Sequence, residues 1–259
     1  MSPWKDQINQ AFGNASEDYA KNANLQRTTT TELVKRIAKF PISSAPRVLE
    51  IGCGTGFLTQ ALHSIYPGAN WTITDISLDM LASCQRTIGN AANMRFQQMD
   101  GEFPTVDGGF DLICANMTFQ WFEDLPGSIA NLVDLLSPGG VLAYTTLCHG
   151  SLFEWQEAHR GCGFIPGTPE YPLVKVLKSY WPDTHGEGAV DAAGIEQKYP
   201  NSFAFARAIK GIGAETPAEG HHPLNAGSMR RVLRSLDQQD NVTMTYQVAY
   251  ATYQKYADT

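Results

Sequence analysis

The fold of this chain is decided by one stretch, Arg47-Val48-Leu49-Glu50-Ile51-Gly52-Cys53-Gly54-Thr55-Gly56-Phe57-Leu58. Its apolar residues form a run too short for a helix and closed by glycines, which predicts a buried parallel strand. Glycines at every second position then allow a tight turn and let a ligand approach the backbone, because no Cβ stands in the way. Apolar residues at helical spacing continue from Phe57. The stretch therefore predicts a strand, a glycine loop, and a helix whose N-terminus faces the ligand of the loop.

Two classes of ligand compete for this arrangement. The dinucleotide fingerprint is G-x-G-x-x-G, with a pyrophosphate at the helix N-terminus. Here the spacing is G-x-G-x-G, and Glu50 stands two residues before the first glycine. A carboxylate beside the loop suits a cationic ligand better than a pyrophosphate. The pattern resembles the first motif of class I S-adenosylmethionine (SAM) methyltransferases, whose ligand carries a sulfonium and an ammonium. A glycine-rich turn that holds no ligand stays an alternative on this motif alone.

Composition limits the class of protein. The 259 residues, 43% of them hydrophobic and 17% charged, can bury the core of one elaborated globular domain. No run approaches the roughly 18 apolar residues of a membrane helix, and the N-terminus has no signal-peptide layout. Five widely spaced cysteines without a C-x-x-C pair read as reduced thiols and not as a metal site. A net charge of −7 argues against nucleic-acid binding. We therefore expect a cytoplasmic protein that binds no membrane.

Acids and amides end successive predicted strands. Asp75 closes the strand 71–75 and lies roughly 20 residues beyond the loop, where nucleoside-binding folds place the carboxylate that accepts the ribose hydroxyls. Asp100 closes the strand 94–100, and Asn116 closes the strand 110–116. Ligands of open α/β sheets collect at these strand tips. Together with Glu50, the series favours an α/β fold of the SAM-binding, Rossmann-like type.

The remaining segments predict what surrounds this sheet. Residues 4–40 read as a helical N-terminal arm, and 141–147 as a fifth strand. Beyond residue 150 we expect helices at 151–160 and 173–180 and a weak strand at 195–199, followed by helices at 202–212 and 228–236 and a closing strand at 242–253. The prediction is a seven-stranded sheet, mostly parallel with an antiparallel closing strand. Its divisions are an arm and SAM-binding core (1–150), a helical lid insertion (151–200) and a C-terminal completion of the sheet (201–259).

Several stretches resemble one family, the malonyl-acyl-carrier-protein O-methyltransferases of biotin synthesis. They are 11–19, 25–27, 116–121, 145–152 and 209–214. The resemblance implies SAM as cofactor, S-adenosylhomocysteine as product, malonyl-acyl-carrier protein or malonyl-CoA as substrate, and a monomer. The cofactor residues it implies are Tyr19, Gln26, Glu50, Gly52, Cys53, Gly54, Asp75, Ile76, Met80, Asp100, Gly101 and Asn116, and the substrate residues are Tyr19, Gln120, Arg207 and Lys210. Docking of an acidic carrier would fall to Lys175, Lys178, Arg207, Lys210, Arg230, Arg231 and Arg234.

The implied reaction needs little acid–base chemistry. A malonyl carboxyl group should have a pKa of roughly 4 and be ionised at neutral pH, so no general base is required. We accordingly assign no catalytic residue, and the histidines show no catalytic spacing. Three alternatives stay open: a methyltransferase of another small carboxylic acid or a quinone-like acceptor, a non-catalytic SAM-binding protein, and an NAD-dependent oxidoreductase. The G-x-G-x-G spacing of the glycine loop disfavours the last.

Overall fold

One mixed β-sheet forms the centre of the protein. The computed structural model describes residues 2–182, 185–237 and 241–257. In this part of the chain the sheet has seven strands in the order β3-β2-β1-β4-β5-β7-β6. Strands β1 to β5 are parallel, and β7 runs antiparallel between β5 and β6. The predicted fold class is confirmed. The strands are β1 (Arg47–Ile51), β2 (Asn70–Asp75), β3 (Met94–Gln98), β4 (Phe110–Ala115), β5 (Leu136–Leu147), β6 (Gly186–Tyr199) and β7 (Val242–Lys255).

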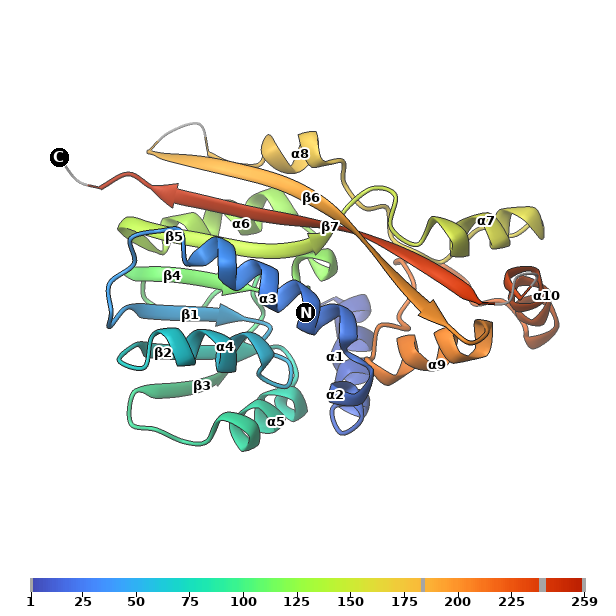
Figure 1. The fold of residues 1–259 in the computed structure, drawn as a ribbon, viewed down its shortest axis with the longest axis horizontal. Helices are drawn as coiled ribbons and strands as arrows, with labels where there is room; N and C mark the ends of the chain where they lie inside the picture. Colours follow the sequence, from blue (N-terminus) through green and yellow to red (C-terminus); the bar gives the residue numbers. More distant parts are fainter. Residues whose placement is uncertain (1, 183–184, 238–240, 258–259) are drawn as a thin grey trace.

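Helices cover both faces of the sheet, and further helices gather past the carboxyl ends of its parallel strands (Figure 1). The first face packs against α3 (Asn24–Ile37), α4 (Phe57–Ile65) and α5 (Leu78–Ile88), and the second against α6 (Leu125–Asp134) and α8 (Val174–Lys178). The other helices lie beyond the carboxyl ends of the parallel strands. They are α1 (Pro3–Ala15), α2 (Tyr19–Asn22), the 3-10 helix η1 (Phe119–Trp121), α7 (Phe153–Gly161), α9 (Ser202–Gly211) and α10 (Ala226–Leu236).

Alternation along β1 explains the two-sided core. Leu49 and Ile51 pack on the α6 side of the sheet, whereas Val48 packs with α3 and α4. All three side chains are at most 2% exposed. A central parallel strand is covered on both faces, so its sequence reads as a nearly continuous apolar run.

Strand β6 is longer than the sequence predicted. The weak strand expected at 195–199 begins at Gly186 and pairs with β7 over its whole length. The last part of the segment expected as a helical insertion, from Gly186 to Tyr199, is therefore strand. The helices beyond the strand tips that follow β5 in the chain come from two places, α7 before β6 and the pair α9–α10 between β6 and β7. The prediction missed this because β6 is an edge strand: within this fully described strand, Val190 is the one buried residue, so no apolar alternation marks it.

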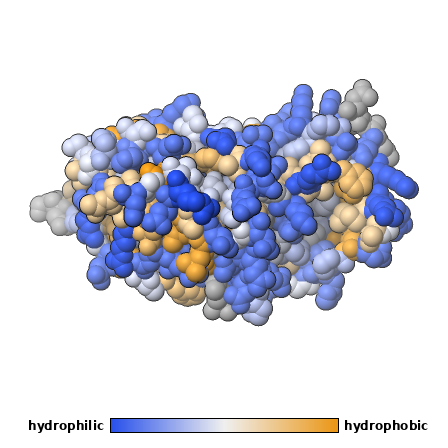
Figure 2. Space-filling view, turned by 90° about the horizontal axis from the view of Figure 1, so that it is seen from below, coloured by the Kyte–Doolittle hydropathy of each residue, from blue (hydrophilic) through white to orange (hydrophobic). Residues whose placement is uncertain are grey.

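The outer surface is mostly polar where it is visible. Figure 2 shows one face covered largely by hydrophilic residues, with apolar residues in separate small groups. Among the helices that the structure describes, none has the length and hydrophobicity needed to cross a membrane.

The pairing of β6 gives a test of the fold. A Cβ at Gly188 would overlap the ring of Trp181, which itself stacks on Tyr253 with ring centroids 5.3 Å apart. We expect Gly188→Ala to lower the free energy of unfolding by about 1–3 kcal/mol through overpacking, as measured by urea denaturation. Gly194→Ala in the same strand is the control, because its Cβ would meet only the end of the flexible Gln247 side chain, at 3.2 Å. Equal effects of the two substitutions would contradict this account.

Candidate active site

Two cavities adjoin at the carboxyl edge of the parallel strands. The first lies against the tips of β1, β2 and β4, with α1 as its opposite wall. The second, of about 390 Å³, lies among α3, η1, α7, α9 and α10. Both are lined by Phe12, Tyr19, Met117 and Trp121, so these four side chains form the seam between the cavities.

The glycine loop forms the floor of the first cavity. Gly52 has φ +66°, and a Cβ there would lie 2.5 Å from the side chain of Thr118, so both backbone and space require glycine. Gly54 lies under the Tyr19 ring, which would be 3.9 Å from a Cβ at that position. Gly101 also lines this cavity, and a Cβ there would overlap Ile51. The backbone is thus left bare where a ligand can approach it.

Asp75 ties the glycine loop to the tip of β2. Its Oδ2 accepts a hydrogen bond from the Gly54 amide (2.9 Å), and its Oδ1 accepts one from the Ser77 amide (2.8 Å). Burial raises the pKa of Asp75 to about 6, although these amide donors act in the opposite direction. The carboxyl group lines the first cavity and keeps lone pairs available for hydroxyl donors.

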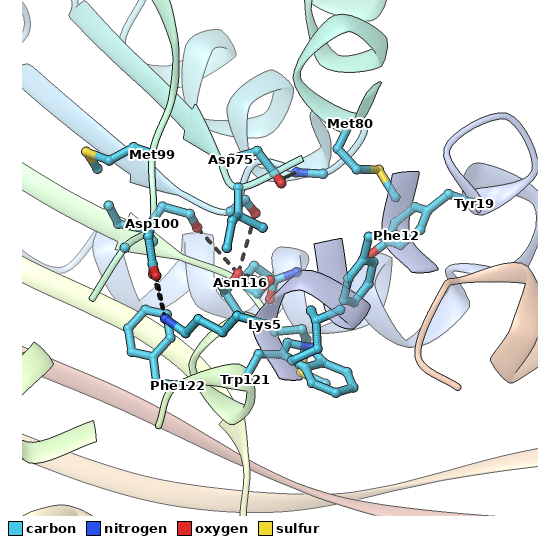
Figure 3. Close-up of a pocket in the computed structure, with 18 residues that line it drawn as sticks. Lys5, Phe12, Tyr19, Asp75, Met80, Met99, Asp100, Asn116, Trp121 and Phe122 are labelled. Atoms are coloured by element: carbon cyan, nitrogen blue, oxygen red, sulfur yellow. Dashed lines mark hydrogen bonds and ion pairs between the residues drawn. The ribbon is translucent and has the colours of Figure 1, made fainter. Parts of the chain in front are cut away.

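Asp100 has a partner that the sequence did not predict. Lys5 of α1 reaches into the first cavity, where its Nζ lies 2.7 Å from both carboxylate oxygens of Asp100 and also pairs with Glu102. Figure 3 shows the Lys5 side chain pointing at Asp100, beside Phe122. Lys5 is only 3% exposed. Burial raises the pKa of Glu102, but hydrogen bonds from Lys5 and from the Glu123 and Asp124 amides outweigh burial and leave that pKa lowered.

Glu50 does not face the first cavity, contrary to the expectation of a carboxylate beside a cationic ligand. It is 1% exposed, and its carboxylate accepts a hydrogen bond from Thr59 Oγ1 (2.7 Å) on α4. Strand alternation turns Glu50 to the same side as Val48. Burial raises its pKa to about 8. Cys53 is likewise buried in the core on this side and lines neither cavity.

Asn116 holds α3 against the strand tips. Its Nδ2 donates to the carbonyl of Gln26 and to Thr30 Oγ1, both at 3.0 Å, and its Oδ1 accepts from Thr145 Oγ1 at 2.8 Å. Both amide hydrogens are thus engaged within the protein. Asn116 still lines the first cavity, whereas the Gln26 side chain lines the second, on the far side of the seam.

The structure therefore sorts the expected site residues into groups. The first cavity brings together most of the expected cofactor residues: Tyr19, Gly52, Gly54, Asp75, Ile76, Met80, Asp100, Gly101 and Asn116. Gln120 and Tyr19, two of the expected substrate residues, line the second cavity. Arg207 and Lys210 line neither, because α9 turns Phe205 and Ile209 inward and leaves the two basic side chains exposed.

The second cavity is predominantly apolar. Its described lining contains aromatic and aliphatic side chains, with His159, Glu215 and His221 among the ionisable groups and no lysine or arginine. His159 Nδ1 lies 2.9 Å from the carbonyl of Trp155, and burial lowers the histidine pKa, which favours a neutral ring. These residues come from α7 and the loop after α9, and no spacing in the sequence links them.

Met117 is strained at the seam. This non-glycine residue has φ +55°. Its amide donates to Thr145 Oγ1 (2.8 Å), and its carbonyl accepts from Gln120 Nε2 (2.7 Å). Such a backbone conformation persists only where surrounding contacts fix it, and it is common at functional sites. The Gln120 side chain thus helps to hold the backbone where the two cavities meet.

Comparisons with known proteins agree with this architecture. Residues 48–140 match the model of a methyltransferase domain. The chain is 39% identical over 253 residues to the malonyl-[acyl-carrier protein] O-methyltransferase of Magnetococcus marinus, covering 97% of this chain and 93% of that protein. It is 41% identical over 249 residues to the biotin biosynthesis bifunctional protein BioCD of Bordetella avium, of which it spans 52%. The fold is similar to that of the YcgJ protein from Bacillus subtilis, with a TM-score of 0.62 and 15% identity, over 87% of this chain and 98% of that one.

The placement of Glu50 predicts a pH effect on stability. An acid whose pKa folding raises from 4.5 to about 8 keeps its proton in the folded state after the unfolded chain has lost it. The free energy of unfolding therefore falls as pH rises between these values, by at most about 1.4 kcal/mol per pH unit from this group. Glu50→Gln should therefore make the free energy of unfolding fall less steeply between about pH 6.5 and about pH 8. This range is chosen because it lies above the pKa of Asp75, which is about 6.

Urea denaturation across this pH range measures the effect. Because Glu50 does not line the first cavity, we also expect Glu50→Gln to bind S-adenosylhomocysteine with unchanged affinity. A marked loss of affinity at constant stability would show that the Glu50 carboxyl group acts on the ligand.

Proposed function

Because the chain belongs to the malonyl-[acyl-carrier protein] O-methyltransferase family, we propose that it esterifies the free carboxyl group of a malonyl thioester carried on acyl-carrier protein. The chain is a SAM-dependent methyltransferase, and S-adenosylhomocysteine is its second product. The observation that carries the choice of acceptor is the second cavity, whose apolar walls meet the first cavity at Tyr19, Met117 and Trp121.

The first cavity fits the chemistry of SAM. The Asp75 carboxyl group has lone pairs for the ribose hydroxyls, and Gly52 and Gly54 leave the backbone open to the methionyl part. Ile76 and Met99, which line the same cavity, would offer apolar contacts to the adenine ring, and Asp100 would accept from its amino group. When bound, SAM supplies an electrophilic methyl group on a sulfonium.

The second cavity suits a carboxylate that attacks without help from a base. The malonyl carboxylate is already ionised at neutral pH, and its oxygen forms the new O–CH₃ bond as the S–CH₃ bond breaks. The anionic acceptor and the cationic donor neutralise each other in this step, so the transition state carries less charge than the reactants. Walls that exclude water and offer no lysine or arginine, within the described lining, do not over-stabilise the anion in the ground state. Orientation and exclusion of water are then the main contributions of the protein.

A basic outer surface supports delivery of the substrate by a carrier. We define it by the exposed residues Arg207 and Lys210 of α9 and Arg230, Arg231 and Arg234 of α10. Both helices also line the second cavity through their inner faces. Since the whole protein carries a charge of −7, attraction of an acidic carrier would be local and sensitive to salt.

Transfer of labelled methyl from SAM tests the proposed reaction. We expect label on malonyl-acyl-carrier protein and none on acetyl-acyl-carrier protein, because the acetyl group has no free carboxylate. The labelled product should be hydrolysed by mild base as a methyl ester. Absence of transfer by an enzyme that binds S-adenosylhomocysteine would reject malonyl thioesters as the acceptor and leave the methyltransferase fold unaffected.

The two faces of α9 should respond differently to substitution. Ile209 lines the second cavity, so Ile209→Trp should raise the KM for malonyl-acyl-carrier protein and for malonyl-CoA alike, by about tenfold or more. Arg207→Ala and Lys210→Ala, on the exposed face, should raise only the KM for the carrier-bound substrate, and less so at high salt. Ile209→Leu is the size-matched control. A large effect of Arg207→Ala with malonyl-CoA would instead place that guanidinium at the acceptor.

A further inference from the structure

Helix α1 is a wall of both cavities. Lys5, Ile8 and Phe12 line the first cavity, and Phe12 also lines the second. Figure 3 shows Lys5 and Phe12 reaching to opposite ends of the first cavity, toward Asp100 and Tyr19 respectively. A single helix at the N-terminus therefore closes the cofactor side and contributes to the acceptor side.

Two contacts tie the same helix to the walls of the second cavity. The indole Nε1 of Trp4 donates a hydrogen bond to the carbonyl of Pro217 (2.8 Å), a residue that lines the second cavity. Gly213, in the turn after α9, has φ +70°, and a Cβ there would lie 2.7 Å from the Ala11 carbonyl oxygen and the Phe12 Cα. The segment that follows α9 thus packs directly on the backbone of α1. Any displacement of α1 would disturb both cavities together.

The buried ammonium of Lys5 attaches α1 to the loop that follows β3. It lies between Asp100 and Glu102, with the Phe122 ring centroid 5.6 Å away. Glu102 is itself fixed, because it accepts hydrogen bonds from the amides of Glu123 (3.0 Å) and Asp124 (2.8 Å). Removing Lys5 would leave the two carboxylates buried without their cationic partner, so a substitution at Lys5 should disturb both α1 and the first cavity.

We propose that Lys5 is a positioning residue for the cofactor and that α1 couples the two cavities. Lys5 orients the Asp100 carboxylate at the first cavity and holds α1 closed over the cofactor. The same helix lines the second cavity through Phe12 and is bonded to its wall through Trp4 and Pro217, so the cofactor and the acceptor bind with positive coupling. The role of Lys5 depends only on the cofactor, whereas the coupling rests on the proposed function of the second cavity.

Calorimetric titration with S-adenosylhomocysteine tests the role of Lys5 without turnover. We expect Lys5→Met to bind at least about tenfold more weakly than the wild type, and Lys5→Arg to restore most of the affinity because it keeps the charge. Lys39→Met is the matched control, since Lys39 is exposed just beyond the end of α3 and lines neither cavity. Unchanged affinity of a folded Lys5→Met protein, whatever its Tm, would overturn the proposal and reduce Lys5 to a packing residue.

A second titration tests the coupling. Malonyl-acyl-carrier protein is titrated into the enzyme with and without S-adenosylhomocysteine, in the absence of a methyl donor. We expect S-adenosylhomocysteine to tighten binding of the carrier at least about fivefold. Trp4→Phe keeps an aromatic ring but removes the hydrogen bond to Pro217, and it should reduce this factor while Lys5 stays in place. Equal affinities in the wild type would overturn the coupling. If the carrier binds under neither condition, the proposed acceptor is wrong, and the Lys5 proposal is decided by the first titration.

Discussion

The arrangement of the site depends on the two backbone hydrogen bonds that Asp75 accepts. They join the glycine loop after β1 to the first turn after β2, so two chain segments that leave neighbouring strands keep a fixed separation. The bare backbone at Gly54 then lies under the Tyr19 ring, and the N-terminal arm has a surface on which to rest. A carboxylate that binds two amides and is buried has its geometry set before any ligand arrives, which reduces the ordering cost of binding.

Features encoded within one strand and its loop could be predicted from the sequence. The strands β1 to β5, the positive φ angles of the glycine loop, and the positions of Asp75 and Asp100 at strand tips all follow from short-range pattern. Glu50 was misplaced because its position next to the glycines was weighed above the alternation of β1, which turns it toward α4. The strand β6 was underestimated because pairing with β7, and not apolar burial, holds it in the sheet.

Features that need contacts between distant segments could not be predicted. Lys5 and Asp100 are 95 positions apart, and a lysine in an amphipathic helix reads as a surface residue until its partner is known. The second cavity collects side chains from α1, α3, η1, α7, α9 and α10, so no local spacing describes it. Arg207 was assigned to the acceptor from resemblance, whereas the inward face of α9 is its apolar one.

The hairpin of β6 and β7 has a consequence for how such enzymes diverge. These strands pair residue by residue from Gly186 with Lys255 to Tyr199 with Val242, and α9 and α10 are inserted between them. The sheet is thus complete whatever the inserted segment contains. Substitutions there can reshape the second cavity without changing the residues at the tips of β1 and β2, which line the first cavity. The fold thus places much of the second cavity on a stretch of chain apart from the glycine loop and Asp75, so the two cavities can vary through different segments, with α1 as the part that they share.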